Sequence, residues 1–228
     1  MKNIGIIAAL ALLILLESCQ PPVVFGEPQP SDVRPLSHIP KNYWGYYWCR
    51  MDSVALFVDE RALIKRKEIR VKLTRTEIEG SPELELRKDA LFVRDWDQSF
   101  PVEQRGDSIF STLVVRDTLF NIGEHEVPKL WKGHLILNKE FDENAWMVSV
   151  LTLGKDGMLT MARAELPEDL AQLGEIVDVK TMSTENGQVT QIFIVPNQEQ
   201  FEMIFQQGIL FGDNCSEFER IIPLTILD

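Results

Sequence analysis

Short runs of alternating apolar and polar residues dominate the chain beyond residue 42. In the run EIRVKLT, Ile69, Val71 and Leu73 would lie on one face of a strand, and Arg70 and Lys72 on the other. A period of two is typical of a half-buried strand, because successive side chains point to opposite faces of a sheet. The run therefore predicts a strand with one face in a core and the other in water.

Other short runs predict further strands. They cover residues 43–49, 54–58, 84–87, 91–96, 108–115, 118–122 and 134–138. Two predicted hairpins join residues 145–153 to 158–166 and residues 176–182 to 188–195. The second contains Asn186-Gly187, a pair that favours a type I′ turn because both central residues of that turn need positive φ.

Helical patterns are few. Residues 197–208 have Asn197 as a candidate N-cap with Gln200 three positions later, and Gly208 as a stop. Residues 166–174 predict a shorter helical turn. The fold class expected is all-β with few short helices, as an antiparallel meander that forms a barrel or a sandwich. With no second linker, residues 42–228 are interpreted as a single β-rich domain.

The N-terminus has the features of an export signal. Lys2 precedes an apolar segment, residues 4–16, which would span only about 20 Å as a helix, too short for the roughly 30 Å core of a bilayer. Residues 1–18 are therefore interpreted as a signal peptide. Residues 20–40 contain six prolines, and we expect residues 19–41 to form an extended proline-rich tether.

The segment LLESCQ resembles the bacterial lipobox, although Glu17 stands where that motif has a small or aliphatic residue. Together with the PQP segment and the following IPKNYWGYY, it resembles small outer-membrane lipoproteins of Bacteroidota. The resemblance implies cleavage before Cys19 and attachment of acyl chains such as palmitate to that residue. Residues 20–24 contain no acidic residue, which by analogy with such proteins implies an anchored protein that faces the periplasm.

The net charge bears on the binding partners that we expect, and the cysteines bear on a possible disulfide. The net charge of −12 argues against binding to nucleic acid. If Cys19 is acylated, Cys49 and Cys215 remain, and they could form a disulfide in an oxidising compartment or stay as two buried thiols.

The sequence contains no nucleophile elbow, P-loop, dinucleotide-binding turn or zinc-binding helix, and we expect no catalytic residues and no cofactor. Glu124, His125 and Glu126 are adjacent, so strand geometry would direct them to opposite faces. We therefore expect no metal site.

Two groups are candidates for binding. Arg70 and Lys72 belong to a basic run, residues 61–75, and could meet lipid phosphates, an acidic glycan or an acidic envelope protein; the alternative is a solvated edge strand. Trp44, Tyr46 and Trp48 would share a strand face and could line the mouth of a barrel; the alternative is that they are core residues.

These features predict a non-enzymatic interaction or structural module, anchored to the outer membrane. The alternative function is a lipocalin-like carrier or sensor that binds a small apolar or sugar ligand in a barrel. A weaker alternative is a diverged hydrolase without a recognisable motif.

Overall fold

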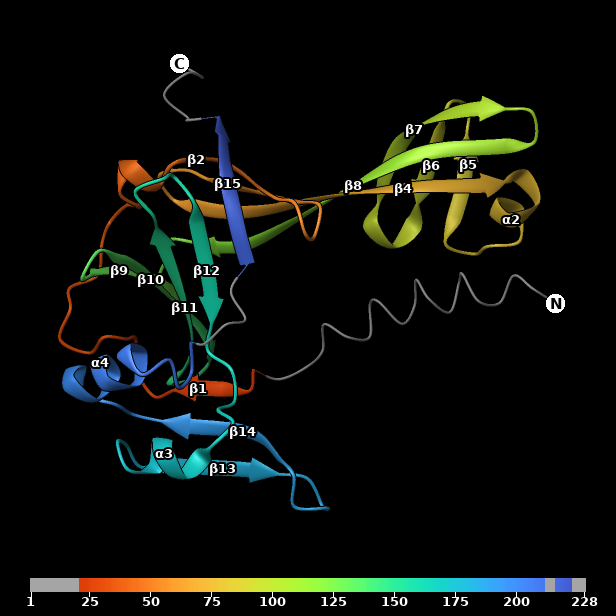
Figure 1. Ribbon diagram of the computed structural model, residues 1–228. Coiled ribbons are helices and arrows are strands. Elements are labelled where there is room, and N and C mark those ends of the chain that lie inside the picture. The colour runs from red at the N-terminus through yellow and green to blue at the C-terminus, as the bar shows by residue number, and fades with distance from the viewer. Residues whose placement is uncertain (1–20, 212–215, 223–228) are drawn as a thin grey trace. The chain divides into compact units, whose positions relative to one another are not determined.

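The structure, a computed structural model, describes residues 21–211 and 216–222. Strands predominate and the few helices are short, which confirms the predicted all-β class. The chain divides into two compact units (Figure 1). The smaller unit is Arg66–Asp117, and the larger unit is formed by the described residues before and after it.

The larger unit is built on a mixed sheet. Its strands are β1 (Val23–Phe25), β2 (Gly45–Cys49), β3 (Val54–Val58), β9 (Glu126–Trp131), β10 (His134–Asp142), β11 (Ala145–Leu153), β12 (Leu159–Arg163), β13 (Val179–Ser183), β14 (Val189–Ile194) and β15 (Ser216–Ile222), with the first part of β4 (Ala62–Thr74) and the last part of β8 (Ser108–Asn121). Its helices are a 3-10 turn (Lys41–Tyr43), α3 (Leu170–Gly174) and α4 (Gln198–Gln206).

The strand order is β13-β14-β1-β11-β12-β15-β2-β3-β4-β8, and β10 pairs with both β11 and β9. The sheet is not closed, so it fits a sandwich or an open sheet. Within residues 21–211 and 216–222 the sheet therefore does not form the closed barrel expected of a lipocalin-like carrier.

Two hydrophobic clusters cover opposite faces of β10. Leu135 and Leu137 belong to the cluster that contains Tyr47 of β2, whereas Ile136 belongs to the cluster that contains Phe201 of α4. A strand covered on both faces has apolar residues at consecutive positions. This explains why apolar residues occupy consecutive positions in the run HLILN, whereas apolar and polar residues alternate in most of the other strands.

The expectation that residues 19–41 form an extended tether is wrong for the described part of that segment. Residues 23–25 form β1, which pairs in parallel with β14, Val23 opposite Ile192, and antiparallel with β11. Phe25 and Ile39 are both 0% exposed. The segment therefore contributes to the core of the larger unit.

The physical reason is that side chains of the sheet satisfy the proline-rich backbone. Lys129 of β9 donates from Nζ to the carbonyl oxygens of Pro28 and Pro30, at 2.7 Å each. Asn138 of β10 accepts from the Gln29 backbone N–H at 2.6 Å and donates to its carbonyl at 2.9 Å. Prolines lack an N–H but keep a carbonyl acceptor, so donors from β9 and β10 can hold such a segment without strand pairing.

The smaller unit has a sheet of strand order β4-β8-β7-β6-β5. Its elements are the last part of β4, α2 (Arg75–Glu79), β5 (Leu84–Arg87), β6 (Ala90–Val93), a 3-10 turn (Arg94–Trp96), β7 (Gln98–Arg105) and the first part of β8. Its core contains Ile78, Leu91, Val93, Phe100, Ile109 and Leu113. The interpretation of residues 42–228 as one domain is therefore wrong. No linker marks the division, because β4 and β8, of 13 and 14 residues, contribute to both units.

Both predicted hairpins are confirmed, since β11 pairs with β12 and β13 with β14. The predicted type I′ turn is wrong. Gly187 has φ of 79° and donates to the Thr184 carbonyl at 2.9 Å, and Asn186 does not share the positive φ. This is a turn that ends in one left-handed glycine, as in three-residue hairpin loops.

The predicted helix after Asn197 is also confirmed. The Asn197 side chain accepts a hydrogen bond from the Gln200 N–H at 2.9 Å, and the Gln200 side chain accepts one from the Asn197 N–H. After the helix, Gly208 has φ of 65°. The shorter helix α3 lies within the predicted range 166–174.

Candidate functional site

The outer face of β4 in the smaller unit carries the predicted basic strip. Arg70 and Lys72 are exposed, while Ile69, Val71 and Leu73 are partly buried and pack against the core. The alternation predicted from the run EIRVKLT is therefore confirmed.

Lys72 contributes to a cluster of cations around one aromatic ring. Phe110 of β8 is half-buried, with Lys72 Nζ 5.7 Å and the Arg105 guanidinium carbon 5.4 Å from its ring centroid. Glu103 of β7 lies opposite Phe110 in the strand register, so β7 and β8 present these residues on the same face. We call Arg70, Lys72, Arg105 and Phe110 the basic face.

A second cation–ring contact lies on the neighbouring strands. The Arg87 guanidinium of β5 is 3.5 Å from the ring centroid of Phe92 on β6. Arg87 Nε also donates to Glu85 at 2.9 Å, and Arg94 pairs with the same carboxylate at 3.0 Å. The hydrogen bond from Arg87 lowers the pKa of Glu85, which keeps this cluster ionised.

The cations differ in whether a carboxylate neutralises them. Arg105 Nε lies 2.8 Å from Glu103 and Arg87 pairs with Glu85, but Arg70 and Lys72 have no carboxylate partner among the described residues. The uncompensated positive charge of the basic face therefore lies on β4.

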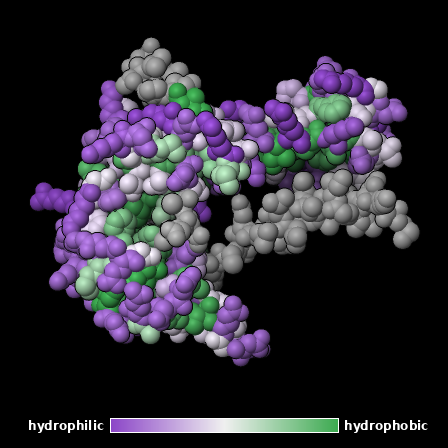
Figure 2. All heavy atoms as spheres, viewed as in Figure 1, coloured by the Kyte–Doolittle hydropathy of each residue, from purple (hydrophilic) through white to green (hydrophobic). Residues whose placement is uncertain are grey.

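Charge is unevenly divided between the units. Residues 66–117 contain 10 basic and 11 acidic residues, whereas residues 20–65 and 118–228 contain 12 basic and 23 acidic residues. The smaller unit is close to neutral, so an anion meets less repulsion there than at the larger unit. Figure 2 shows hydrophobic side chains exposed between hydrophilic ones on the visible face of the smaller unit.

The basic face can bind an anion with little loss of side-chain freedom. A long cationic side chain that lies against an aromatic ring is already restricted, so less conformational entropy is lost when it meets a ligand. All of these groups are partly or fully exposed, so the attraction is screened by salt.

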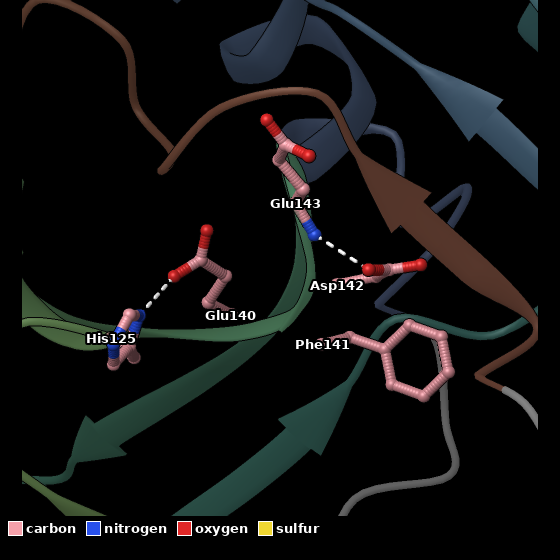
Figure 3. Close-up of a pocket in the computed structure, with 5 residues that line it drawn as sticks. All are labelled: His125, Glu140, Phe141, Asp142 and Glu143. Atoms are coloured by element: carbon pink, nitrogen blue, oxygen red, sulfur yellow. Dashed lines mark hydrogen bonds and ion pairs between the residues drawn. The ribbon is translucent and has the colours of Figure 1, made fainter.

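A second candidate is the hollow of about 400 Å³ lined by His125, Glu140, Phe141, Asp142 and Glu143 (Figure 3). His125 Nδ1 pairs with the Glu140 carboxylate, and this hydrogen bond raises the pKa of His125. Figure 3 shows that Phe141 and Glu143 point away from the pair. The side chains do not converge on one point, and the hollow has the geometry of a surface ion pair rather than a catalytic site.

The adjacent residues Glu124 to Glu126 do not act together. Glu126 Oε1 lies 3.1 Å from Lys139 Nζ, while His125 pairs with Glu140. Within residues 21–211 and 216–222, no group of three or more His, Cys, Asp or Glu residues is placed to hold a metal ion. No helix in this part of the chain is long and apolar enough to cross a membrane.

Trp44, Tyr46 and Trp48 are half-buried, and the described sheet is open, so it forms no barrel mouth for them to line. A role of these residues in ligand binding stays a prediction. The face of β2 that enters the core is the opposite one, with Tyr47 and Cys49 at 0% and 2% exposed. Tyr47 can be buried because its hydroxyl donates to the Tyr43 carbonyl at 2.7 Å.

The cysteine predictions fall largely outside the described residues. Cys49 is buried, with Sγ 3.8 Å from Asp52 Oδ2. Cys19 and Cys215 are not among the described residues. Acylation of Cys19 and pairing of Cys49 with Cys215 stay predictions.

The sequence alone did not reveal the aromatic and arginine components of the basic face, Phe110 and Arg105. One signal was present in Glu103-Gln104-Arg105, because residues two apart in a strand share a face. Placing Arg105 beside Lys72 required the strand order, which no spacing in the sequence encodes.

Comparison with known proteins gives no match for the chain among family models, curated proteins or solved structures.

Proposed function

We propose that this chain is a lipoprotein of the outer membrane, acylated at Cys19 and facing the periplasm, that acts as a non-enzymatic interaction module. Its smaller unit binds an acidic glycan through the basic face. The observation that carries the proposal is that Arg70 and Lys72 are exposed and have no carboxylate partner among the described residues, with Lys72 over the ring of Phe110.

The position of Cys19 supports the anchoring part of the proposal. The described fold begins at Pro21, so cleavage before Cys19 would remove no described residue. Pro21 already takes part in the fold, because its carbonyl accepts from Gln191 Nε2 at 2.8 Å. Two acyl chains give stable attachment, since each buried methylene contributes about 0.8 kcal/mol.

The surface of the smaller unit favours a glycan over a protein partner. The large hydrophobic residues that are most exposed, Met51, Leu130, Phe141, Met182, Val195, Met203 and Ile221, all belong to the larger unit. The cores of protein interfaces are apolar and depleted of charge. A face of cations and half-buried rings suits a polar chain of carboxylated sugars better.

The test is binding to polygalacturonate, a linear glycan with one carboxylate per sugar, compared with the neutral glycan dextran. Replacing both cations of β4, R70Q with K72Q, removes two exposed ionic contacts. We expect roughly five- to tenfold weaker binding to polygalacturonate and a smaller dependence on salt.

The matched control is K155Q with K180Q, which removes two exposed lysines from the larger unit and changes the net charge equally. We expect it to bind like the unaltered chain. Equal weakening by both pairs would show that net charge, and not the basic face, determines binding, and binding to neither glycan would overturn the proposal.

A further inference from the structure

The β13–β14 hairpin lies at the point where the N-terminal segment enters the larger unit. β1 and β14 are parallel, with Val23, Val24 and Phe25 opposite Ile192, Phe193 and Ile194. The start of β1 therefore lies at the same end as the start of β14. Since β14 starts directly after the hairpin turn, the chain enters β1 from the side of that turn (Figure 1).

A side-chain hydrogen bond links the N-terminal segment to β14, which in turn pairs with β13. The Pro21 carbonyl accepts from Gln191 Nε2, and Gln191 lies opposite Met182 of β13. Neighbouring strands are about 4.8 Å apart, so Met182 lies roughly 10 Å from the N-terminal segment. The hairpin flanks this entry point on one side of β1, and β11 flanks it on the other.

Little chain separates Cys19 from this point. Gln20 alone stands between Cys19 and Pro21. Successive Cα atoms are about 3.8 Å apart, so the Cα atoms of Cys19 and Pro21 are at most about 7.6 Å apart. An acyl group on Cys19 would therefore hold the larger unit close to the lipid surface.

The end of the hairpin offers a surface for that contact. Residues 181–188 are all exposed, and Met182 is 57% exposed. Met182 is a flexible apolar side chain, and the other residues of 181–188 are small or polar, with one acidic side chain, Glu185. Such a mixture suits the polar head-group region of a bilayer.

We infer that the β13–β14 hairpin, residues 181–188, is a membrane-contact surface that packs against lipid head groups, with Met182 inserted at the interface. This inference rests on the proposed acylation of Cys19. It assigns to the larger unit a defined orientation at the membrane, which acylation alone would not impose.

The experiment is amide hydrogen exchange on the full acylated chain in phosphatidylcholine vesicles, compared with the unacylated Cys19→Ser variant added to the same vesicles. We expect exchange at residues 184–188 to be roughly tenfold slower in the acylated protein. Exchange at the β7–β8 turn, Gly106 and Asp107, should be the same in both samples.

A substitution at Met182 distinguishes insertion of this side chain into the membrane from mere proximity of the hairpin to the membrane. Met182→Glu should keep the acyl group and the vesicle attachment but lose most of the protection at residues 184–188. The control is Met203→Glu, at another exposed methionine, on α4, which should leave that protection unchanged.

The outcomes distinguish the two claims. An N-terminus without acyl groups, read by mass spectrometry, would overturn the proposed anchoring. An acylated protein whose residues 184–188 exchange as fast as in the Cys19→Ser variant would overturn the hairpin contact and leave the anchoring intact. Equal loss of protection in the Met182 and Met203 variants would show that Met182 has no specific role.

Discussion

Lys129 and Asn138 show how two residues can turn a proline-rich segment into part of a core. Each binds backbone atoms about 100 positions away in the sequence, and each is buried, at 3% and 0% exposed. Burial lowers the pKa of Lys129, so its charge is costly, and the two proline carbonyls compensate for that cost. Neither contact could be predicted, because proline content is equally typical of a tether.

Asn138→Ala should lower the free energy of unfolding by about 2–4 kcal/mol. The substitution leaves the buried Gln29 N–H and carbonyl and the Val127 carbonyl without this partner, and unsatisfied buried groups cost about 1–3 kcal/mol each before relaxation. Urea unfolding measures the change. Asn42→Ala, at an exposed asparagine, should cost far less; similar losses in both variants would show that the bonds to Gln29 contribute little.

His125 and His134 should titrate on opposite sides of the ordinary histidine pKa of 6.5. The hydrogen bond to Glu140 raises the pKa of His125, and burial lowers the pKa of His134. NMR titration of the two rings checks the order. Glu140→Gln should move the His125 midpoint back toward 6.5 and leave His134 unchanged.

The two shifts have opposite effects on stability. The contribution of the His125–Glu140 pair is present below pH 6.5 and is lost as the pH rises through the raised pKa of His125. For His134 the unfolded chain takes up the proton more readily, so stability falls as the pH drops below 6.5. A Glu140→Gln variant whose stability keeps the same pH dependence as the unaltered chain would contradict the assignment to His125.

At the scale of elements, local signals predicted most strands and the helix α4, and failed where two signals competed. Thr74 and Glu77 form a capping box that starts α2, but Thr74 also ends the strand run EIRVKLT. Strand β7 was not predicted, and Pro101 in its middle is unfavourable for a strand because proline has no N–H to donate. In the structure the Pro101 carbonyl still accepts a hydrogen bond, from Ser111 Oγ at 2.9 Å. Turn types were the least predictable, because Asn-Gly suits more than one turn.

Gly157→Ala should lower the free energy of unfolding by about 1–2 kcal/mol. Gly157 has φ of 84° in the β11–β12 turn, and a Cβ there would meet no atom within 4 Å, so the cost is backbone strain and not a clash. Thermal or urea unfolding measures it. Gly157→Asn should cost less, because asparagine tolerates this conformation better; equal costs would point to a different cause.

At the scale of the whole molecule, the strand patterns predicted the class of fold but not its division into two units. A second domain is usually recognised by its linkers, and here the connections are the strands β4 and β8 themselves. The basic residues were visible in the sequence, but that they belong to a nearly neutral unit and not to the acidic one follows only from knowing which residues form each unit.

The larger unit should fold without residues 66–117. In it, the residue before β4 and the residue after β8 are bonded to each other, because the Ile122 N–H donates to the Arg61 carbonyl at 2.8 Å. Joining Lys65 to Thr118 through an Asn-Gly turn should therefore close a hairpin. Circular dichroism and urea unfolding should show a cooperative β-rich protein that no longer binds polygalacturonate.

The full chain with R70Q and K72Q is the matched comparison for that deletion, because its binding should be roughly five- to tenfold weaker with the smaller unit still present. A shortened chain without a cooperative unfolding transition would show that the larger unit depends on the smaller one. A folded shortened chain that still bound polygalacturonate would place the glycan site elsewhere.

The parallel pairing of β1 with β14 also sets the order in which the fold can be completed. Pro21 and Gln191, which hold the start of β1 in place, are 170 residues apart. A chain is made from its N-terminus, so residues 23–25 are available long before residues 189–194 can pair with them. Contacts of such large sequence separation form slowly. During synthesis, the apolar segment Val23 to Phe25 must therefore remain unpaired with β14 while nearly all of the chain follows it.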